Sequence, residues 1–352
     1  MITFRALDKH LDPVPADVLR AVARIDEGRG RQDVHRTQHP MVLETLQQVA
    51  MVQSVKASNA IEDIRVPGRR LRQIALDKVE PEDRSEAEIA GYRRVLAEIH
   101  ANGENIPFTL DVIKQLHGWL YTYLPEERSS HWKRSDNTVT TTHPDGTEVP
   151  RFRPVSVGDT PRYMNELQQR FGQAWAEDRY HPLLLVGAYV LDFLVIHPFQ
   201  DANGRMSRLI TSLLLRQRDY QVGRYISWEQ LISESRDTYY QALERSTIGW
   251  HDGEHDLRPW LSYFLGVLVA SYAQFEERAK LGAGPGTRKA LVEHFVRTNL
   301  SERFTVGDVR EIIPGTSDVQ VGRILRDLKR REIIDRRGAG KNTYWVRVRP
   351  DR

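Results

Sequence analysis

The chain has 352 residues and a formal net charge of +3, with 40% hydrophobic and 28% charged residues. This length is enough for two or three domains, and this composition excludes a largely disordered chain. The sequence has no cysteine, which excludes disulfides, thiolate-ligated zinc or iron–sulfur sites and a cysteine nucleophile, so we expect a reducing compartment.

Apolar residues recur at helical spacing along most of the chain, so we expect a mainly α protein. The predicted helices span residues 41–64, 86–100, 110–124, 161–175, 182–196, 203–218, 228–244 and 257–278. The helix at 182–196 is apolar almost all round, which predicts a buried core helix. It is shorter than the ~18 apolar residues of a membrane span and contains Asp192. The N-terminal residues lack the pattern of a signal peptide, and we expect a cytoplasmic protein without a membrane segment.

A change of pattern between the third and fourth of these helices predicts a β-hairpin at 138–150. Residues 138–142 are a β-branched run, residues 144–147 read Pro-Asp-Gly-Thr, and residues 148–152 can return as a strand. On composition alone, such a hairpin is also compatible with an ordinary surface loop.

Residues 281–286 contain three glycines and a proline, which predicts a linker. Beyond it we expect helices at 288–298, 306–312 and 318–331, then strands at 333–336 and 343–348 joined by a glycine-containing wing. This order predicts a winged helix-turn-helix domain over residues 287–352.

The C-terminal segment is basic. Arg288 to Arg352 contains 16 basic and 9 acidic residues, a net of +7, which leaves −4 on the remainder. DNA binding would use Arg323, Arg326, Lys329, Arg330, Arg331, Arg336, Arg337 and Lys341. The alternative is a solvated basic surface on a protein-docking or dimerisation module. Only Gln320 offers an amide for base reading on the third helix, so no DNA sequence is inferred.

Residues 197–208 read His-Pro-Phe-Gln-Asp-Ala-Asn-Gly-Arg-Met-Ser-Arg and join the buried helix to the next one. Free N–H groups at the start of a helix favour an anion, and Gly204 lets the backbone approach it closely. Arg205 and Arg208 are three residues apart, so both can reach phosphate oxygens on one side of the helix.

Two further residues of this segment suit transfer chemistry on a nucleoside triphosphate. Asp201 is a hard oxygen ligand of the kind that Mg²⁺ takes beside phosphates. His197 has an ordinary pKa near neutrality, as a general base requires. Each residue alone is also compatible with an ordinary loop at the start of a helix.

Together these residues resemble the motif of the Fic (Fido) family, His-Pro-Phe-x-[Asp/Glu]-[Gly/Ala]-Asn-Gly-Arg-x-x-Arg. Ala202 stands where glycine is commoner. The resemblance covers about residues 35–275. It implies a Fic-type helical bundle with a β-hairpin flap, an N-terminal helical region at 1–105 and a catalytic core at 106–280 that precedes the winged helix.

The resemblance also implies a role for each residue. His197 would deprotonate a target hydroxyl, and Asp201 would hold Mg²⁺. The nucleotide-binding residues would be Ala202, Asn203, Gly204, Arg205 and Arg208, with Arg205 on the β-phosphate and Arg208 on the γ-phosphate. The reaction would transfer AMP from ATP to a Ser, Thr or Tyr hydroxyl of a target protein and release pyrophosphate. Gly204 disfavours a Doc-type kinase, in which lysine is expected at this position.

An upstream segment resembles the family's inhibitory helix motif, [Ser/Thr]-x-x-x-Glu-[Gly/Asn]. It places Ser58 and Glu62 near the end of a helix over about residues 43–64, with Asp63 where glycine or asparagine is expected. By resemblance, Glu62 would pair with Arg208 and hold down the activity. A solvated acidic pair at a helix end is the alternative.

The resemblance assigns two peripheral elements as well. The hairpin would be the flap that binds the target protein, with Thr140 and Thr141 near its base. Tyr239 and Tyr240 would line the nucleotide side of the cleft, although a tyrosine pair on a helix is equally typical of core packing.

Two other functions remain open from the sequence. The same site could remove AMP from modified proteins, with Glu62 positioning a water. A DNA-binding regulator could use the Fic domain as a sensor, although its catalytic loop would then be expected to lose residues that are all present here. The composition does not decide between a monomer and a homodimer.

Overall fold

The computed structural model describes residues 3–38, 40–124, 130–142, 148–280, 287–298, 303–312, 316–340 and 343–348. The α-helices up to residue 280 are α1 (Leu7–Leu11), α2 (Ala16–Gln38), α3 (Pro40–Ile61), α4 (Gly68–Ala75), α5 (Arg84–Asn102), α6 (Leu110–Leu120), α7 (Thr160–Glu177), α8 (Pro182–Ile196), α9 (Asn203–Gln217), α10 (Trp228–Glu234), α11 (Arg236–Thr247) and α12 (Arg258–Lys280). The mainly α fold expected from the sequence is confirmed. The predicted linker at 281–286 lies outside the described residues.

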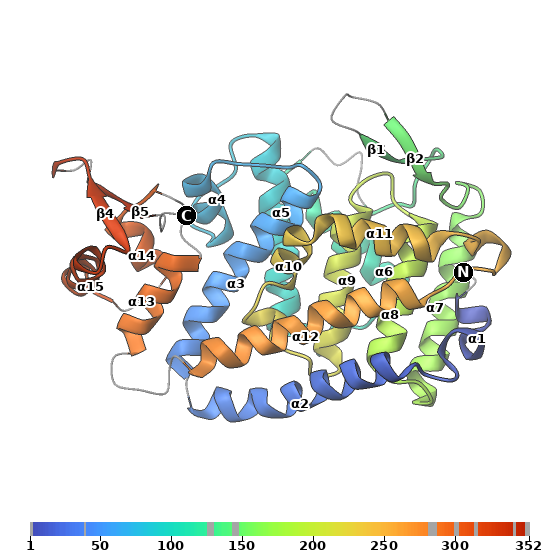
Figure 1. Ribbon diagram of the computed structural model, residues 1–352. Coiled ribbons are helices and arrows are strands. Elements are labelled where there is room, and N and C mark those ends of the chain that lie inside the picture. The colour runs from blue at the N-terminus through green and yellow to red at the C-terminus, as the bar shows by residue number, and fades with distance from the viewer. Residues whose placement is uncertain are drawn as a thin grey trace.

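Helix α8 is the buried centre of the body, with α7, α9 and α12 packed around it (Figure 1). Every residue of α8 except Pro182 is buried, as the continuous apolar sequence predicts. The one carboxylate in it, Asp192, accepts hydrogen bonds from Thr3 Oγ1 at 2.6 Å and Trp250 Nε1 at 2.7 Å. These donors offset the cost of burying a polar group and fix the N-terminal segment against α8.

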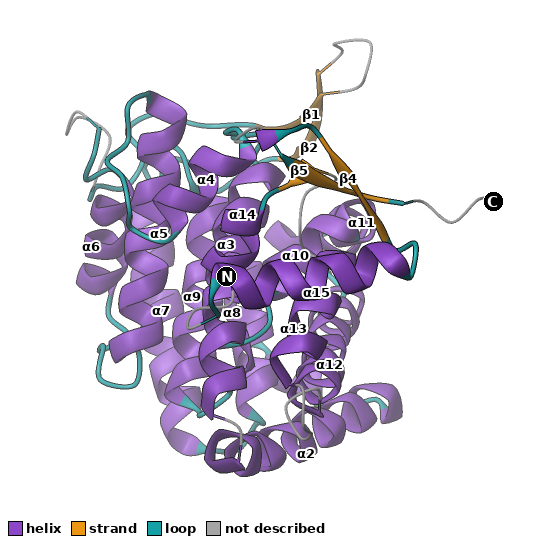
Figure 2. Cartoon of the chain, turned by 90° about the vertical axis from the view of Figure 1, so that its left-hand side faces the viewer, coloured by secondary structure: helices purple, strands orange, loops and turns teal. Residues whose placement is uncertain are grey.

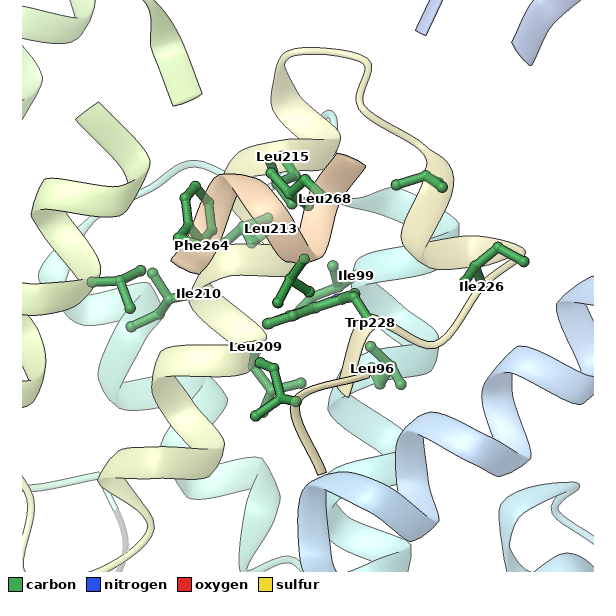
Figure 3. Close-up of a cluster of buried hydrophobic side chains, with 14 of the residues drawn as sticks. Leu96, Ile99, Leu209, Ile210, Leu213, Leu215, Ile226, Trp228, Phe264 and Leu268 are labelled. Atoms are coloured by element: carbon green, nitrogen blue, oxygen red, sulfur yellow. The ribbon is translucent and has the colours of Figure 1, made fainter. Parts of the chain in front are cut away.

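One part of the apolar core joins four helices beside the site (Figure 3). It contains Leu96 of α5, Leu209 and Leu213 of α9, Trp228 of α10 and Leu268 of α12, all buried. Since α9 carries the second half of the predicted motif, this packing fixes that helix from several sides at once.

The predicted helix at 228–244 is wrong, because the chain breaks at Ser235 into α10 and α11. Ser235 lies outside the helical region, with φ of −114° and ψ of 32°, and its Oγ donates to the Leu231 carbonyl and contacts Tyr263 Oη at 2.8 Å. The break lets α10 pack on α3 while α11 packs on α12. The predicted helix at 110–124 also ends early, at Leu120, and Tyr121 then points its hydroxyl toward Asp201.

The N-terminal helices cover the body rather than standing apart from it. Helix α2 lies along α12, and α3 packs on α5 and α10 (Figure 1). Helix α2 was not predicted from the sequence, because it is rich in charged residues and has few apolar ones. Among the described residues, no helix combines the length and apolar character needed to span a lipid bilayer.

The predicted hairpin strands are present as β1 (Val139–Thr142) and β2 (Glu148–Phe152), which pair antiparallel with Thr140 opposite Pro150. The turn at 143–147 lies outside the described residues. The hairpin stands beside α11 at the edge of the body (Figure 1).

The last part of the chain forms what we call the C-terminal unit. It consists of α13 (Thr287–Thr298), β3 (Arg303–Phe304), α14 (Val306–Ile312), α15 (Asp318–Arg330), β4 (Ile334–Arg337) and β5 (Tyr344–Arg347). The strands form an antiparallel sheet in the order β3-β5-β4. The sequence analysis did not find β3, since two residues are too short for a pattern. Helix α14 contacts α3, and Arg72 Nη1 of α4 pairs with Asp308 Oδ1 at 2.6 Å.

One close helix contact gives a test of the fold. A Cβ at Gly91 of α5 would overlap the Leu120 carbonyl at the end of α6, and both groups are on backbone that cannot rotate away. We therefore expect Gly91→Ala to lower the free energy of unfolding by about 1–3 kcal/mol, the usual cost of overpacking. Chemical denaturation of the full chain measures this change.

The matched control is Gly172→Ala in α7, where nothing lies within 4 Å of the new Cβ. Because alanine is the better helix former, this variant should gain about 0.5–1 kcal/mol. Equal stability changes at the two positions would contradict the packing of α5 against α6.

Candidate functional site

The loop between α8 and α9 is fixed by hydrogen bonds to its own backbone. Asn203 spans it, accepting from the Phe199 N–H at 2.9 Å and donating to the Phe199 carbonyl at 2.8 Å. Both ends of the Asn203 amide are thus used inside the loop. Its side chain shapes the loop, and only its main chain at the start of α9 is left to face an anion.

Lys133 holds the loop from outside. Its Nζ lies 3.3 Å from the Ile196 carbonyl and 3.0 Å from Asn137 Oδ1, and the side chain is buried. Burial lowers the pKa of Lys133 to about 8, with Asp136 partly opposing the shift. Lys133 is not predictable from the sequence, because a lone lysine before a hairpin carries no signal.

His197 ends α8 in the left-handed conformation, with φ of 52°, and its N–H donates to the Phe193 carbonyl. Its Nδ1 lies 3.1 Å from the Leu194 carbonyl, which can only accept. The neutral ring therefore carries its proton on Nδ1, and Nε2 is unprotonated. Burial lowers the pKa of His197 to about 4, and the neighbouring Lys133 ammonium adds to this shift. The ring is therefore neutral at pH 7 and has the protonation state of a general base.

Asp201 lies just before α9 with its carboxylate about half exposed. Its Oδ2 accepts from Tyr121 Oη at 3.0 Å, and its Oδ1 accepts from the Ala202 N–H at 2.6 Å. Although burial opposes ionisation, the Arg205 guanidinium and these donors keep the pKa of Asp201 below its usual range.

Asp201 fits a magnesium ion that binds mainly to phosphates. No group of three or more His, Asp or Glu side chains arranged to hold a metal occurs among the described residues. A single ionised and accessible carboxylate is the donor set that Mg²⁺ uses when substrate phosphates and water supply its other ligands.

The start of α9 has the geometry of an anion site that is closely covered. Ala202 has φ of 64°, a conformation that favours glycine and explains why glycine is commoner here in the motif. A Cβ on Gly204 would overlap Glu62 Oε1. The Glu62 carboxylate therefore lies directly over the first turn of α9, where free N–H groups and the helix dipole favour negative charge.

Arg208 is buried and held by the end of α3. Its Nε donates to Ser58 Oγ at 2.7 Å, and its Nη2 donates to the Ser58 carbonyl at 2.9 Å and to Glu62 Oε1 at 2.7 Å. Burial opposes the charge, but Glu62 raises the pKa of Arg208 above its usual value. The contact between Glu62 and Arg208 that the resemblance implied is present. Arg208 Nη1 has no hydrogen-bond partner in the described part of the chain.

Arg205 has a carboxylate partner that the sequence analysis missed. Its Nη1 lies 2.8 Å from Glu88 Oε2 of α5, with both side chains almost fully buried, and its Nη2 lies 3.6 Å from Asp201 Oδ2. A glutamate in the otherwise apolar part of a helix was the available signal, because buried charges are usually paired. Arg205 Nε is without a hydrogen-bond partner among the described residues.

Asp63 adopts the conformation for which the motif prefers glycine or asparagine. Its φ is 58°, and its carboxylate accepts from Arg236 of α11, with Oδ2 at 3.2 Å from Nη2. Arg236 also donates to the Ile61 carbonyl at 3.0 Å. The departure from the motif is therefore accommodated, and it ties the end of α3 to α11.

The two tyrosines differ. Tyr239 is buried against Trp260 and Tyr263, so its ring belongs to the core and has no face open for an adenine. Tyr240 is half-buried, with the Arg236 guanidinium 5.7 Å from its ring centre. Tyr239 therefore fits the alternative of core packing.

The predicted target-binding residues lie on the hairpin. Thr140 and Thr141 are in β1, and the structure describes their backbone alone. Phe152 at the end of β2 lies near the loop between α8 and α9, with its ring centre 6.1 Å from that of His197. The strands therefore border the side of the loop on which His197 lies.

Comparison with known proteins agrees with this geometry. Residues 107–215 match the sequence profile described as Fic/DOC family. The chain contains a Fic/DOC domain. This domain spans α6 to α9 and includes both the hairpin and the loop with His197.

The similarity to solved structures extends beyond residues 107–215. A Fic family protein from Desulfovibrio desulfuricans aligns with a TM-score of 0.62 and 18% identity, over 96% of this chain and 98% of that one. A Fic domain containing signaling protein from Bacteroides thetaiotaomicron aligns with a TM-score of 0.58 and 17% identity, over 75% of this chain and 97% of that one. A fragment of Fic-1 from C. elegans aligns with a TM-score of 0.56 and 18% identity, over 74% of this chain and 73% of that one. At these identities the comparison establishes a shared fold.

The protonation state of His197 can be measured directly. We expect the ring to remain neutral down to about pH 4, because burial disfavours the imidazolium ion. An NMR titration of ring-labelled histidines should show no His197 transition near the ordinary value of about 6.5, with the signal assigned by its loss in His197→Gln. A midpoint near 6.5 for His197 would contradict the buried, Nδ1-bonded ring.

Proposed function

We propose that this protein transfers AMP from ATP to a Ser, Thr or Tyr hydroxyl of a target protein, and that Glu62 restrains this activity. The family of the Fic/DOC domain is known for transferring nucleoside monophosphates to proteins. The observation that carries the proposal is the position of the Glu62 carboxylate, which lies over Gly204 and pairs with Arg208 where a nucleotide phosphate would bind.

The arginines support a triphosphate in particular. Arg205 and Arg208 lie on successive turns of α9, and each keeps a buried N–H group without a partner among the described residues. Such groups are costly unless something accepts from them, and phosphate oxygens do so strongly. Arg205 would contact the β-phosphate and Arg208 the γ-phosphate, while the N–H groups at the start of α9 would take the α-phosphate.

The chemical step follows from the state of His197. Its unprotonated Nε2 accepts the proton of the target hydroxyl as the oxygen attacks the α-phosphorus. A new bond forms between that oxygen and the phosphorus, the bond to the oxygen bridging to the β-phosphate breaks, and pyrophosphate leaves with the electron pair. Asp201 would hold Mg²⁺, which supplies charge neutralisation on the phosphates. Lys133 and Asn203 hold the loop so that His197 keeps its place.

Glu62 would act by competing for Arg208. A carboxylate and a γ-phosphate both require the same guanidinium, and they repel each other if both are present. With Glu62 in place, the triphosphate loses its anchor at one end and the α-phosphate is misplaced for attack. Positioning accounts for much of the rate in such reactions, so a small displacement lowers turnover strongly.

The proposed division of the chain follows the same argument. Residues 1–105 would carry the inhibitory helix α3, residues 106–280 the catalytic core, and residues 287–352 a winged helix-turn-helix. The β1–β2 hairpin would bind the target segment by strand addition and present its hydroxyl to His197.

The test is self-labelling of the purified protein. It is incubated with ATP carrying ³²P at the α position and, in parallel, with ATP carrying ³²P at the γ position. We expect label from the α position alone, a rise of at least about tenfold in Glu62→Gly, and loss of label when His197→Ala is added. Glu44→Gly, at an exposed position on the same helix, controls for weakening of α3.

Two results would contradict the proposal. Label from the γ position would indicate a kinase. Absence of label from Glu62→Gly, in a protein shown separately to bind ATP, would exclude AMP transfer. An AMP-modified protein would then be supplied to test for AMP removal by the same site.

A further inference from the structure

Helix α15 presents one face that is exposed in the described part of the chain. Val319, Arg323, Arg326 and Arg330 follow one another at spacings of four, three and four residues, so they share a face. All four are exposed, and Val319 is 74% exposed, the highest value among the large hydrophobic residues of the described chain. The opposite face holds the buried Val321, Ile324, Leu325 and Leu328.

The basic residues of this unit fall into two groups. Arg331 makes a bidentate ion pair with Glu293 of α13 at 2.6 and 2.7 Å, and Lys329 pairs with Asp335 of β4 at 3.2 Å. These side chains hold the unit together. Arg323 and Arg326 are exposed, and neither has an ion-pair or hydrogen-bond partner among the described residues.

Two further contacts engage the polar side chains at the start of α15. Asp318, the one acidic residue in its first turn, is paired with Arg310 of α14 at 3.2 Å. Gln320 closes a capping box with Ser317, so its amide oxygen is engaged by the helix end. Gln320 is therefore not the free base-reading side chain that the sequence left open, and Val319 and Arg323 are the outward residues nearest the helix start.

The position of α15 leaves this face accessible. Helix α14 contacts α3 of the body, whereas α15 lies on the outer side of the unit, and both views place it there (Figures 1 and 2). Strand β4 carries the exposed Arg336 and Arg337 beside it and leads to Gly338 and Gly340, both with positive φ. A helix flanked by a basic strand and turn is the arrangement with which winged helices bind DNA.

We propose that the C-terminal unit binds double-stranded DNA, with the face of Val319, Arg323 and Arg326 in the major groove. Arg323 near the helix start would reach base edges, Val319 would contact a thymine methyl, and Arg326, Arg330, Arg336 and Arg337 would contact phosphates. A protein partner is the weaker reading, because the face has unpaired charge and one isolated apolar residue rather than an apolar patch.

The proposal distinguishes basic residues that would bind DNA from basic residues that would stabilise the C-terminal unit, a distinction that the sequence alone does not make. The Arg330 pair with Asp327 is a surface pair with Arg330 77% exposed, so it can be exchanged for a phosphate at little cost. Arg331, by contrast, makes a bidentate pair with Glu293 of α13 and would contribute to stability and not to DNA affinity.

The experiment measures binding of the full-length protein to a fluorescein-labelled mixed-sequence duplex of about 30 base pairs, which is about three helical turns. Fluorescence anisotropy is recorded at salt concentrations from about 50 to 200 mM, since phosphate contacts are read from the salt dependence. The variants are Arg323→Ala/Arg326→Ala and, as matched control, Arg20→Ala on the exposed side of α2. Thermal unfolding checks that both variants fold like the parent.

We expect affinity to fall steeply with salt, the double variant to bind at least about tenfold more weakly, and its salt slope to be shallower by about one. The control should bind as the parent does. Selection of duplexes from a random library should then yield a thymine-containing site whose preference is lost in Val319→Ser.

Other outcomes would overturn the proposal. Absence of salt-dependent binding to duplex DNA would exclude it and favour a protein partner for this face. If the double variant and the parent bound DNA equally well, any DNA site would have to lie elsewhere on the molecule. Tighter binding to single-stranded than to double-stranded DNA would exclude a groove-reading helix.

Discussion

The ion pair between Glu62 and Arg208 is the interaction on which the rest of the site depends. Arg208 is buried in the first turns of α9, and a buried guanidinium without a counter-charge is strongly destabilising. Ser58 and Glu62, both from the end of α3, supply that counter-charge and two hydrogen bonds. A nucleotide phosphate bound to Arg208 would therefore replace one anion with another, and under the proposed function the side chain that neutralises Arg208 would also restrain the activity.

Buried ion pairs also connect the N-terminal part of the chain to the Fic/DOC domain. Arg205 is paired with Glu88 of α5, and Arg208 is paired with Glu62 just after α3, so the partners of both arginines lie outside residues 107–215. Ser54 of α3 and Tyr92 of α5 also donate to the buried Glu229 of α10. The helices before residue 105 are thus part of the site's electrostatic balance. Because α14 contacts α3, the C-terminal unit touches the helix that ends directly before Glu62.

The sequence predicted what a local pattern can encode. The motif placed His197, Asp201, Arg205 and Arg208 on one loop and one helix because their spacing is short. The resemblance brought Glu62 to Arg208 across nearly 150 residues, because that pairing belongs to a known motif. Glu88 and Lys133 could not be found in this way, since their roles come from tertiary contacts with no local signature. The break at Ser235 was missed because a serine inside an apolar rhythm is compatible with one helix or two.

The conformation of single residues was likewise beyond the sequence. Ala202 and Asp63 both have positive φ, and each stands where the family motif prefers glycine or a residue that tolerates this region. From the sequence, each substitution counted only as a departure from the motif. In the structure, Asp63 is held by Arg236, which offsets part of the backbone cost. Tyr239, expected from the resemblance at the nucleotide, is instead held in the core by Trp260 and Tyr263.

The most direct measurement of the central claim compares the affinities of ATP and ADP, both with Mg²⁺. It uses isothermal titration calorimetry on His197→Ala and on His197→Ala/Glu62→Gly, so that turnover does not interfere. If Glu62 competes for the γ-phosphate at Arg208, removing it should strengthen ATP binding by at least about tenfold, or about 1.4 kcal/mol, and change ADP binding far less. An equal change for both nucleotides, or none for ATP, would contradict the account.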